Sequence, residues 1–317
     1  MSIRIVPFEA AHVPDAARLF VASLERLRRR VPALPSDLAD IDAVRRRLEP
    51  MSGFAAMDGG QLAGYLTSWF PIERFRGTGR VGAYSPEWAH GSSGGNRRAV
   101  DNALYRAASA AWSTAGCDTH AITILAVDDP ALETWFWSGF GMGTIDAIRP
   151  MDPLGTAAPS TFEVRRATAG DALALAALDV EHVRHYRDPP VFMAPPPADD
   201  ADAWSAFLER AGASAWLVED DDGPFGFMRF GREFDASAVV ESATGIFISG
   251  AYVRAAYRGR GAAGALLAAA LAHYSAEGMT SCAVDFEAFN PEAAAFWMRH
   301  FAPVCYSVMR APESPFE

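Results

Sequence analysis

Apolar residues recur along the chain with two spacings, and the same order of spacings appears twice. The apolar run 3–8 indicates a strand, and the stretch 13–20 that follows has the spacing of an amphipathic helix. The same succession returns at 162–167 and 171–178. Hairpin-like turns that enter strands follow at 58–65 and 222–227. The offset between matched features stays close to half the chain, so we predict two copies of one domain.

The helix that lies near the end of each predicted copy completes the repeat. Asp129-Pro130 precedes Trp135-Phe136-Trp137, and Asn290-Pro291 precedes Phe296-Trp297. Asp or Asn before Pro is typical of a helix start, because it caps the first turn and Pro suits the first helical position. Asp129 and Asn290 are therefore the expected caps.

The predicted fold is α+β, with two tandem domains that each have a mixed, mostly antiparallel sheet flanked by helices. At 317 residues the chain has room for two domains of ordinary size. The first domain is expected at 1–150 and the second at 162–317. Between them, 151–161 collects Pro, Gly, Ala and Ser and is the expected linker.

Composition narrows the expected partners and compartment. The chain is 50% hydrophobic, and its net charge is -11, with 39 acidic and 28 basic side chains. This charge argues against nucleic acid and slightly favours a cationic or amine-bearing small molecule. No secretory signal is visible at the start, and the longest apolar run, 261–272, is shorter than the ~20 residues of a membrane span. Three cysteines without a CxxC pair fit a reducing interior, so we predict a cytoplasmic protein with no membrane partner.

A glycine-rich segment at 257–264 is the main candidate for ligand binding. It lies between a β-rich strand and an Ala/Leu helix, where the helix start offers free N–H groups to a phosphate. Arg258 and Arg260 add positive charge, so a diphosphate ligand is expected. One alternative is a small-residue helix start chosen for tight packing. Another is a nicotinamide dinucleotide site, since 259–264 fits G-x-G-x-x-G and Asp285 follows about twenty residues later.

At these residues the chain resembles the GNAT superfamily of N-acetyltransferases. Arg258, Gly261 and Ala263 match its Arg/Gln-x-x-Gly-x-Gly/Ala segment, and Asn290 with its short helix matches the downstream element. The resemblance implies acetyl-CoA as co-substrate, lying between the strand that ends at Val253 and the one that ends near Glu287. It further implies direct attack by an amine on the thioester. The implied contacts to the cofactor are Tyr252, Val253, Arg258, Gly259, Arg260, Gly261, Ala262, Ala263 and Asn290.

The first copy departs from this pattern at the equivalent segment, which we place at 96–101. Its glycines are missing there, and Asp101 would put negative charge where a phosphate would lie. We therefore expect one working site, in the second copy. The first copy is expected to be a structural partner, which either shapes the acceptor pocket or is only a scaffold.

Candidates for proton transfer are spread over several elements. The resemblance implies a tyrosine on the helix after Asn290, but Trp297 holds that position and is counted among the cofactor contacts. Tyr306 is the candidate that could replace it, or else it belongs to the core. Glu241 is a candidate base near the central strand. Asp285 and Glu287 share one face of the next strand, where they could bind an ammonium group or belong to a polar sheet face.

The predicted acceptor is the primary amine of a small molecule, and no metal is expected. His182 and His185 share a helix face but lack a carboxylate or Cys ligand set. The proline-rich loop after them suggests Tyr186, Phe192 and Met193 as residues that line the acceptor pocket. A non-catalytic acyl-CoA sensor remains the alternative function. A monomer is expected because the duplication already supplies a pseudo-dimer, with a homodimer as the alternative.

Overall fold

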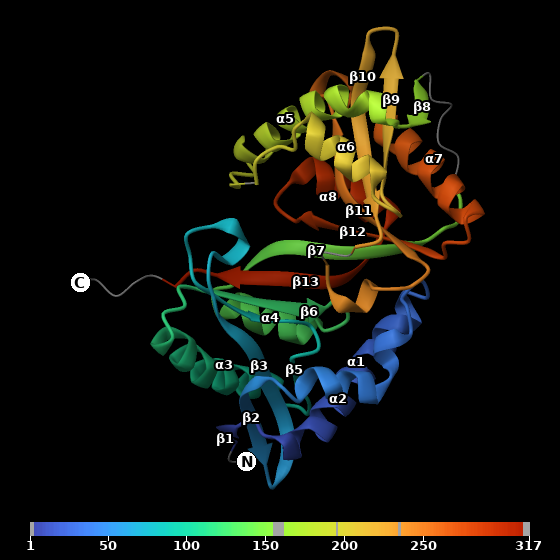
Figure 1. The fold of residues 1–317 in the computed structure, drawn as a ribbon. Coiled ribbons are helices and arrows are strands. Elements are labelled where there is room, and N and C mark those ends of the chain that lie inside the picture. The colour runs from blue at the N-terminus through green and yellow to red at the C-terminus, as the bar shows by residue number, and fades with distance from the viewer. Residues whose placement is uncertain (1–2, 155–161, 195, 234–235, 313–317) are drawn as a thin grey trace. The chain divides into compact units, whose positions relative to one another are not determined.

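The computed structural model describes residues 3–154, 162–194, 196–233 and 236–312 (Figure 1). Residues 155–161 of the expected linker lie outside the described residues. The chain divides into two compact units. The first comprises Met1–Asp146, Ser237–Val239 and Pro303–Glu317, and the second Ala147–Ala236 and Val240–Ala302.

The first unit is a mixed sheet with helices on its faces. Its strands run in the order β1-β2-β3-β4-β6-β13, and β5 also pairs with β3. The pairs are antiparallel except β4 with β6. The elements are β1 (Arg4–Pro7), η1 (Ala10–His12), α1 (Val13–Arg30), η2 (Asp37–Ala39), α2 (Ile41–Leu48), β2 (Ser52–Asp58), β3 (Gln61–Ile72), η3 (Phe75–Gly77), β4 (Gly82–Ser85), β5 (His90–Ser92), α3 (Arg97–Thr114), β6 (Thr119–Leu125) and α4 (Asp129–Trp137).

The last strand of the chain, β13 (Ala302–Arg310), completes this first sheet. It pairs with β6 in antiparallel register from Cys305 opposite Leu125 to Arg310 opposite His120. Val308 is fully buried and packs with Leu104 and Trp112 of α3 in the core of the first unit. In turn β7 (Gly141–Pro150) leaves the first unit after Asp146, and its last residues belong to the second. The compact units therefore exchange the strands that close the two sequence repeats.

The second unit repeats the first. Its strands run in the order β8-β9-β10-β11-β12, antiparallel except for β11 with β12. The elements are β8 (Glu163–Arg166), η4 (Ala169–Asp171), α5 (Ala172–Arg187), α6 (Ala201–Glu209), β9 (Ser214–Asp220), β10 (Gly223–Gly231), β11 (Gly245–Val253), η6 (Ala255–Tyr257), α7 (Ala262–Ala276), β12 (Ser281–Glu287) and α8 (Pro291–His300). The short helix η5 (Ala238–Val240) begins in the segment that belongs to the first unit.

Alternation along β9 shows which helices cover which face of the second sheet. Ala215 and Leu217 pack with α5 and α6 in one core cluster. Trp216 contacts His273 of α7 instead, with ring centroids 5.4 Å apart. Because successive side chains of a strand point to opposite faces, α7 covers the face opposite α5 and α6. The mixed, mostly antiparallel sheet flanked by helices confirms the predicted fold class.

The helix caps near the end of each repeat correct one sequence interpretation. Asn290 caps α8 as expected, with its Oδ1 accepting from Ala293 N. In the first repeat, however, Asp128 is the cap, with its side chain accepting from Ala131 N, and Asp129 is the first helical residue. The Asp-Pro pair marked the helix start correctly, but Pro takes the second helical position there.

Among the described residues, no helix has both the length and the apolar character that crossing a membrane requires.

Candidate functional site

The second half of β11 is paired on one side only. Parallel pairing with β12 runs from Gly245 opposite Ser281 to Ile248 opposite Val284, and no later pair of these two strands is found among the described residues. On the other side, pairing with β10 skips Ser249, which is therefore a bulge. From Ser249 to Val253 the strand thus has a backbone edge that faces the gap left where its pairing with β12 has ended. Such an edge can hydrogen-bond an extended ligand.

The loop after β11 leads into a helix start that no side chain caps. Gly259 and Gly261 have φ of 73° and 88°, which only glycine adopts without strain. Gly261 is the N-cap of α7 and has no side-chain cap hydrogen bond. The first N–H groups of the helix are therefore available to an anion. Gly264 has an ordinary φ, and a Cβ there would meet nothing, so its role in a dinucleotide fingerprint has no structural counterpart.

Both arginines of the loop lie beside this helix start. Arg258 donates from Nε to the Val253 carbonyl at 3.0 Å, and its Nη1 lies 3.4 Å from Glu292 at the start of α8. Arg260 is exposed, with its guanidinium over the rings of Phe162 and Tyr257. Positive charge is therefore available at the loop. The backbone groups of Tyr252 and Val253 lie just upstream in the open half of β11.

The α8 candidates have structural tasks of their own. Asn290 is 5% exposed, and its Oδ1 is occupied by capping the helix. Trp297 is also buried and packs between the rings of Phe296 and Phe301. The proposed cofactor role of Asn290 would therefore use its amide nitrogen. For Trp297 the structure offers a packing role in the core.

One face of α5 lies along the two strands that border the gap. His182 contacts the rings of Phe227 on β10 and Tyr252 on β11, with centroids 5.7 and 5.8 Å away. One turn further on, the Tyr186 hydroxyl lies near the carboxylate of Glu287 on β12. His182 and Tyr186 are spaced i, i+4 and lie on the same face of α5, so this face reaches β11 through His182 and β12 through Tyr186.

The polar groups near Tyr186 are predominantly acidic. Burial, with the nearby carboxylates of Glu287 and Asp285, raises the pKa of Tyr186 well above its usual value. The phenol therefore stays protonated. Asp285 and Glu287 are part-exposed while Phe286 between them is buried, which fits the alternation expected from the sequence. This arrangement suits a ligand that carries positive charge.

A second carboxylate borders the open half of β11. Glu181 forms an ion pair with Arg254 at 2.8 Å, and the Tyr252 hydroxyl donates to its Oε2 at 3.4 Å. Burial and the charge of Glu181 raise the pKa of Tyr252. Tyr252 is therefore held by its hydroxyl, with its ring against His182.

The other candidates do not join this group. Phe192 and Met193 follow α5; Phe192 is exposed, and Met193 N donates to the Tyr186 carbonyl at 2.8 Å. Glu241 is exposed and precedes β11, at the end of the strand remote from its open half. Tyr306 lies on β13 in the first unit, opposite Ile124 of β6.

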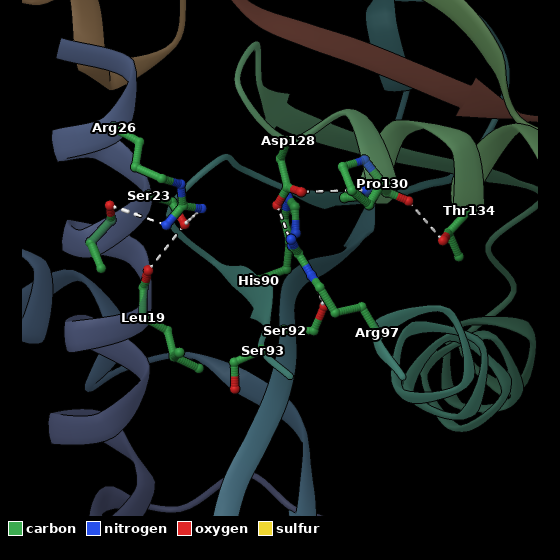
Figure 2. A network of polar contacts seen from close by, with 12 residues as sticks. Leu19, Ser23, Arg26, His90, Ser92, Ser93, Arg97, Asp128, Pro130 and Thr134 are labelled. Carbon is green, nitrogen blue, oxygen red and sulfur yellow. Dashed lines mark hydrogen bonds and ion pairs between the residues drawn. The ribbon is translucent and has the colours of Figure 1, made fainter. Parts of the chain in front are cut away.

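In the first repeat, side chains occupy the equivalent region (Figure 2). Arg97, the first residue of α3, forms an ion pair with the cap Asp128 at 2.5 Å and also donates to Ser92 Oγ. His90 Nε2 lies 2.7 Å from the Thr123 carbonyl, so it bridges β5 and β6. An ion pair and a histidine thus fill the positions that remain open in the second repeat.

Two sequence interpretations of the first repeat change as a result. Aligned by helix start, Asn96 corresponds to Gly261, and Gly94 and Gly95 directly precede it, so glycines are present in that loop. Asp101 does not face a phosphate position. It is buried in α3, and burial raises its pKa to about 6 although Ser92 hydrogen-bonds it.

Sequence reasoning missed Asp179, Glu181 and Arg254, and considered His182 only as a metal ligand. Asp179 lies three residues before His182, with its Oδ1 3.2 Å from the His182 Nδ1. The i, i+3 spacing of Asp and His on a predicted helix was the available signal. The Glu181–Arg254 pair joins α5 to the end of β11, which only the tertiary structure reveals.

Comparisons with known proteins agree with this geometry. Residues 180–301 match the model of the Acetyltransferase (GNAT) family. The structure resembles a GCN5-related N-acetyltransferase from Sphaerobacter thermophilus with TM-score 0.57 and 16% identity, over 99% of this chain and 98% of that one. It also resembles a glucosamine N-acetyltransferase region of a fungal multi-domain β-N-acetylglucosaminidase, with TM-score 0.54 and 13% identity, over 97% of this chain and 38% of that one.

A tandem GNAT protein from the clavulanic acid biosynthesis pathway is 15% identical, with TM-score 0.49, and covers 99% of this chain and 100% of that one. The sequence matched none of the curated proteins with which it was compared. The family match over residues 180–301 and the two structures above TM-score 0.5 show a GNAT fold.

Proposed function

We propose that this chain, whose residues 180–301 are a GNAT-family domain, transfers an acetyl group from acetyl-CoA to the primary amine of a small molecule. The observation that carries the proposal is the open half of β11 followed by the uncapped start of α7. An extended ligand that ends in a diphosphate matches both features. It can pair with the backbone of 249–253 and place its phosphates at the helix N-terminus.

Each part of the cofactor has candidate partners on the chain. The pantetheine arm would pair with the backbone of Val253, because Arg254 N donates to the Phe225 carbonyl and alternation along β11 therefore turns the backbone of Tyr252 toward β10. The diphosphate would lie against the N–H groups that follow Gly261, with Arg258 and Arg260 beside it. The bound thioester supplies an electrophilic carbonyl, and the chain must orient the amine and accept its proton.

The acidic surroundings of Tyr186 support an amine as acceptor. An ammonium group gains charge-assisted hydrogen bonds from carboxylates such as Glu287 and Asp285. An anionic acceptor would be repelled by the same groups. We propose that Tyr186 and Glu287 bind the acceptor, with Phe192 and Met193 at its outer border.

The state of the cysteines bears on the compartment in which the protein works. Cys117, Cys282 and Cys305 are all free and buried, which suits a reducing compartment. We propose a cytoplasmic protein that acts as a monomer.

A non-catalytic acyl-CoA sensor is the second candidate, and one observation favours it. Within α8, which the structure describes throughout, no tyrosine is present to protonate a departing thiolate, and Trp297 is buried. An indole N–H does not release a proton at neutral pH. Thiols are weak acids (cysteine has a pKa of about 8.5), so the sulfur can still leave as thiolate and turnover remains the first candidate.

A dinucleotide oxidoreductase is not supported. Such sites open a parallel, doubly wound sheet, whereas β11 pairs in parallel with β12 alone and in antiparallel with β10.

Two measurements test the proposal. Calorimetric titration with acetyl-CoA, CoA and NAD is expected to show binding of the first two only. Release of free thiol from acetyl-CoA is then followed across a panel of small primary amines. Turnover of at least one amine supports the enzyme. CoA binding without turnover of any amine favours the sensor, and binding of NAD without CoA contradicts both.

A further inference from the structure

The His182–Asp179 pair on α5 has the geometry of an oriented proton acceptor. The two side chains are 15% and 12% exposed, and His182 Nδ1 lies 3.2 Å from Asp179 Oδ1. A carboxylate can only accept, so Nδ1 is the protonated ring nitrogen and Nε2 carries a lone pair. Within the described part of the chain, no hydrogen bond of Nε2 is found.

A chain of hydrogen bonds holds Asp179 in place. Its second oxygen, Oδ2, accepts from the backbone N of Asp199 at 2.8 Å. Arg229 donates to Asp199 Oδ2 at 2.8 Å, and its guanidinium lies 4.0 Å from the centroid of the Phe207 ring. Asp199 thus binds Asp179 directly, and Arg229 of β10 binds Asp199. These contacts orient the Asp179 carboxylate toward His182.

The ring of His182 lies at the open half of β11. A methyl group built on Gly250 would lie 3.9 Å from His182 Cε1, the ring atom next to Nε2. Gly250 follows the bulge residue Ser249, where pairing with β12 has ended. Tyr186, 5.1 Å away by ring centroids, extends the same helix face to Glu287. The histidine therefore stands between the proposed acyl-CoA edge and the proposed ammonium-binding carboxylates.

We propose that His182, oriented by Asp179, is the base that deprotonates the acceptor amine. This inference rests on the proposed function. Nε2 takes a proton from the acceptor ammonium, which leaves a neutral amine and an imidazolium. The amine lone pair forms the C–N bond at the thioester carbonyl, and the C–S bond breaks with its electron pair going to sulfur. The thiolate takes the second amine proton, and His182 returns its own to solvent.

Several charged and titratable groups lie around the imidazole. On α5 these are Asp179, Glu181 and Tyr186. From other elements they are Asp199 before α6, Arg229 on β10, Tyr252 on β11, and Asp285 and Glu287 on β12 beyond Tyr186. Asp179 is the one that hydrogen-bonds the ring, and its charge stabilises the imidazolium.

The test compares His182→Gln, Asp179→Asn and the matched control His185→Gln on the same helix. We expect kcat to fall about 100-fold or more in His182→Gln. The acetyl-CoA dissociation constant should stay within about twofold, and the control should resemble wild type. The acidic limb of the kcat/KM profile against pH should disappear in His182→Gln, and added imidazole should restore part of the rate. In Asp179→Asn the acidic limb of the kcat/KM profile should move along the pH axis.

Nuclear magnetic resonance of the imidazole nitrogens provides a readout besides activity. At neutral pH the wild type should show His182 protonated at Nδ1, and Asp179→Asn should lose that preference. If His182→Gln turns over as fast as wild type with the same pH profile, His182 is not the base, although the proposed function stands. If the wild type transfers acetyl to no amine, the proposed function fails and this role fails with it.

Discussion

Glu87 illustrates how strongly burial acts on single side chains of this protein. It is 2% exposed, and one of its oxygens accepts from Val239 N at 3.2 Å. Burial is the main reason that its pKa rises from 4.5 to about 7. A second buried carboxylate, Asp146, accepts from Ser237 N and adds to the effect. Both carboxylates thus hold the segment 237–239 within the first unit.

This shift predicts a loss of stability on raising the pH. The folded state binds the Glu87 proton more tightly than the unfolded state, so its contribution is complete below about pH 4.5 and is lost as the pH rises through about 7. The shift corresponds to a loss on the order of 3 kcal/mol. In Glu87→Gln, whose amide oxygen can still accept from Val239, this dependence should vanish. Urea unfolding of both proteins at pH 5 and pH 8 measures it, and an equal difference at both values would contradict the assignment.

Glu287 is the residue at which the acceptor proposal can be tested. Glu287→Gln keeps a hydrogen-bond acceptor near Tyr186 but removes the charge. We expect KM for a cationic amine to rise about tenfold, since a charge-assisted hydrogen bond contributes roughly 1.5–3 kcal/mol. Acetyl-CoA affinity should be unchanged. Steady-state kinetics with the amine varied gives the answer, and Glu209→Gln on α6 serves as a distant control. An unchanged KM would remove Glu287 from the acceptor site.

The sequence indicates candidate site residues more readily than it indicates the role of each residue. Gly261 and Arg258 could be proposed from the sequence because the loop pattern is local. Trp297 and Asn290 were assigned to the cofactor, but packing and capping occupy Trp297 and the Asn290 oxygen. The His182–Asp179 pair was overlooked because its importance depends on β11 and β12, which lie far along the chain. Burial of Asp101 likewise depends on how α3 packs, which its sequence position does not reveal.

At the scale of elements, α3 and α7 begin at equivalent positions with different consequences. Asn96 and Gly261 are the N-caps of the two helices. Next to the first, Arg97 is bound to Asp128 of α4. Next to the second, Ala262 and Ala263 leave the helix start open. The sequence predicted the Ala/Leu helix that follows Gly261, but the ion pair beside the start of α3 depends on the approach of α4.

The cap of α4 gives a test at this scale. Asp128→Ala removes both a helix cap and the partner of Arg97, and should lower the free energy of unfolding by about 1–3 kcal/mol. The neighbouring Asp129 is exposed, so Asp129→Ala should change it by less than about 0.5 kcal/mol. Chemical denaturation measures both. If Asp129→Ala lowers the free energy of unfolding more than Asp128→Ala does, Asp129 is the cap, as the Asp-Pro pattern suggested.

At the scale of the whole molecule, the notable feature is the exchange of closing strands. The sequence repeat predicts two domains in series, and each repeat does supply the same order of elements. In the structure, β13 belongs instead to the first compact unit from Pro303 on, and the end of β7 belongs to the second compact unit. Hydrophobic alternation identifies β13 as a strand but not the strand with which it pairs, because the same alternation fits either sheet. The partner of a terminal strand therefore lay beyond sequence reasoning.

This exchange predicts that the first unit is incomplete without the last strand of the chain. A chain ending at Ala302 lacks β13, so it exposes the edge of β6 and loses the buried Val308. We expect cooperative unfolding of the first unit to be lost, as seen by amide hydrogen exchange on β6 and α3. A synthetic peptide of residues 303–312 added in trans should restore part of the protection. Full protection of β6 without the strand would contradict the observed pairing.

The most direct test of the account is the number and location of acyl-CoA sites on the chain. Titration calorimetry with CoA should give one site per chain. Gly261→Asp should abolish binding, while Gly261→Asn, which has a similar backbone strain but no charge, should retain a measurable part of it. The matched change Asn96→Asp at the start of α3 should leave binding intact. Two sites per chain, or loss of binding in Asn96→Asp but not in Gly261→Asp, would contradict a single site at the start of α7.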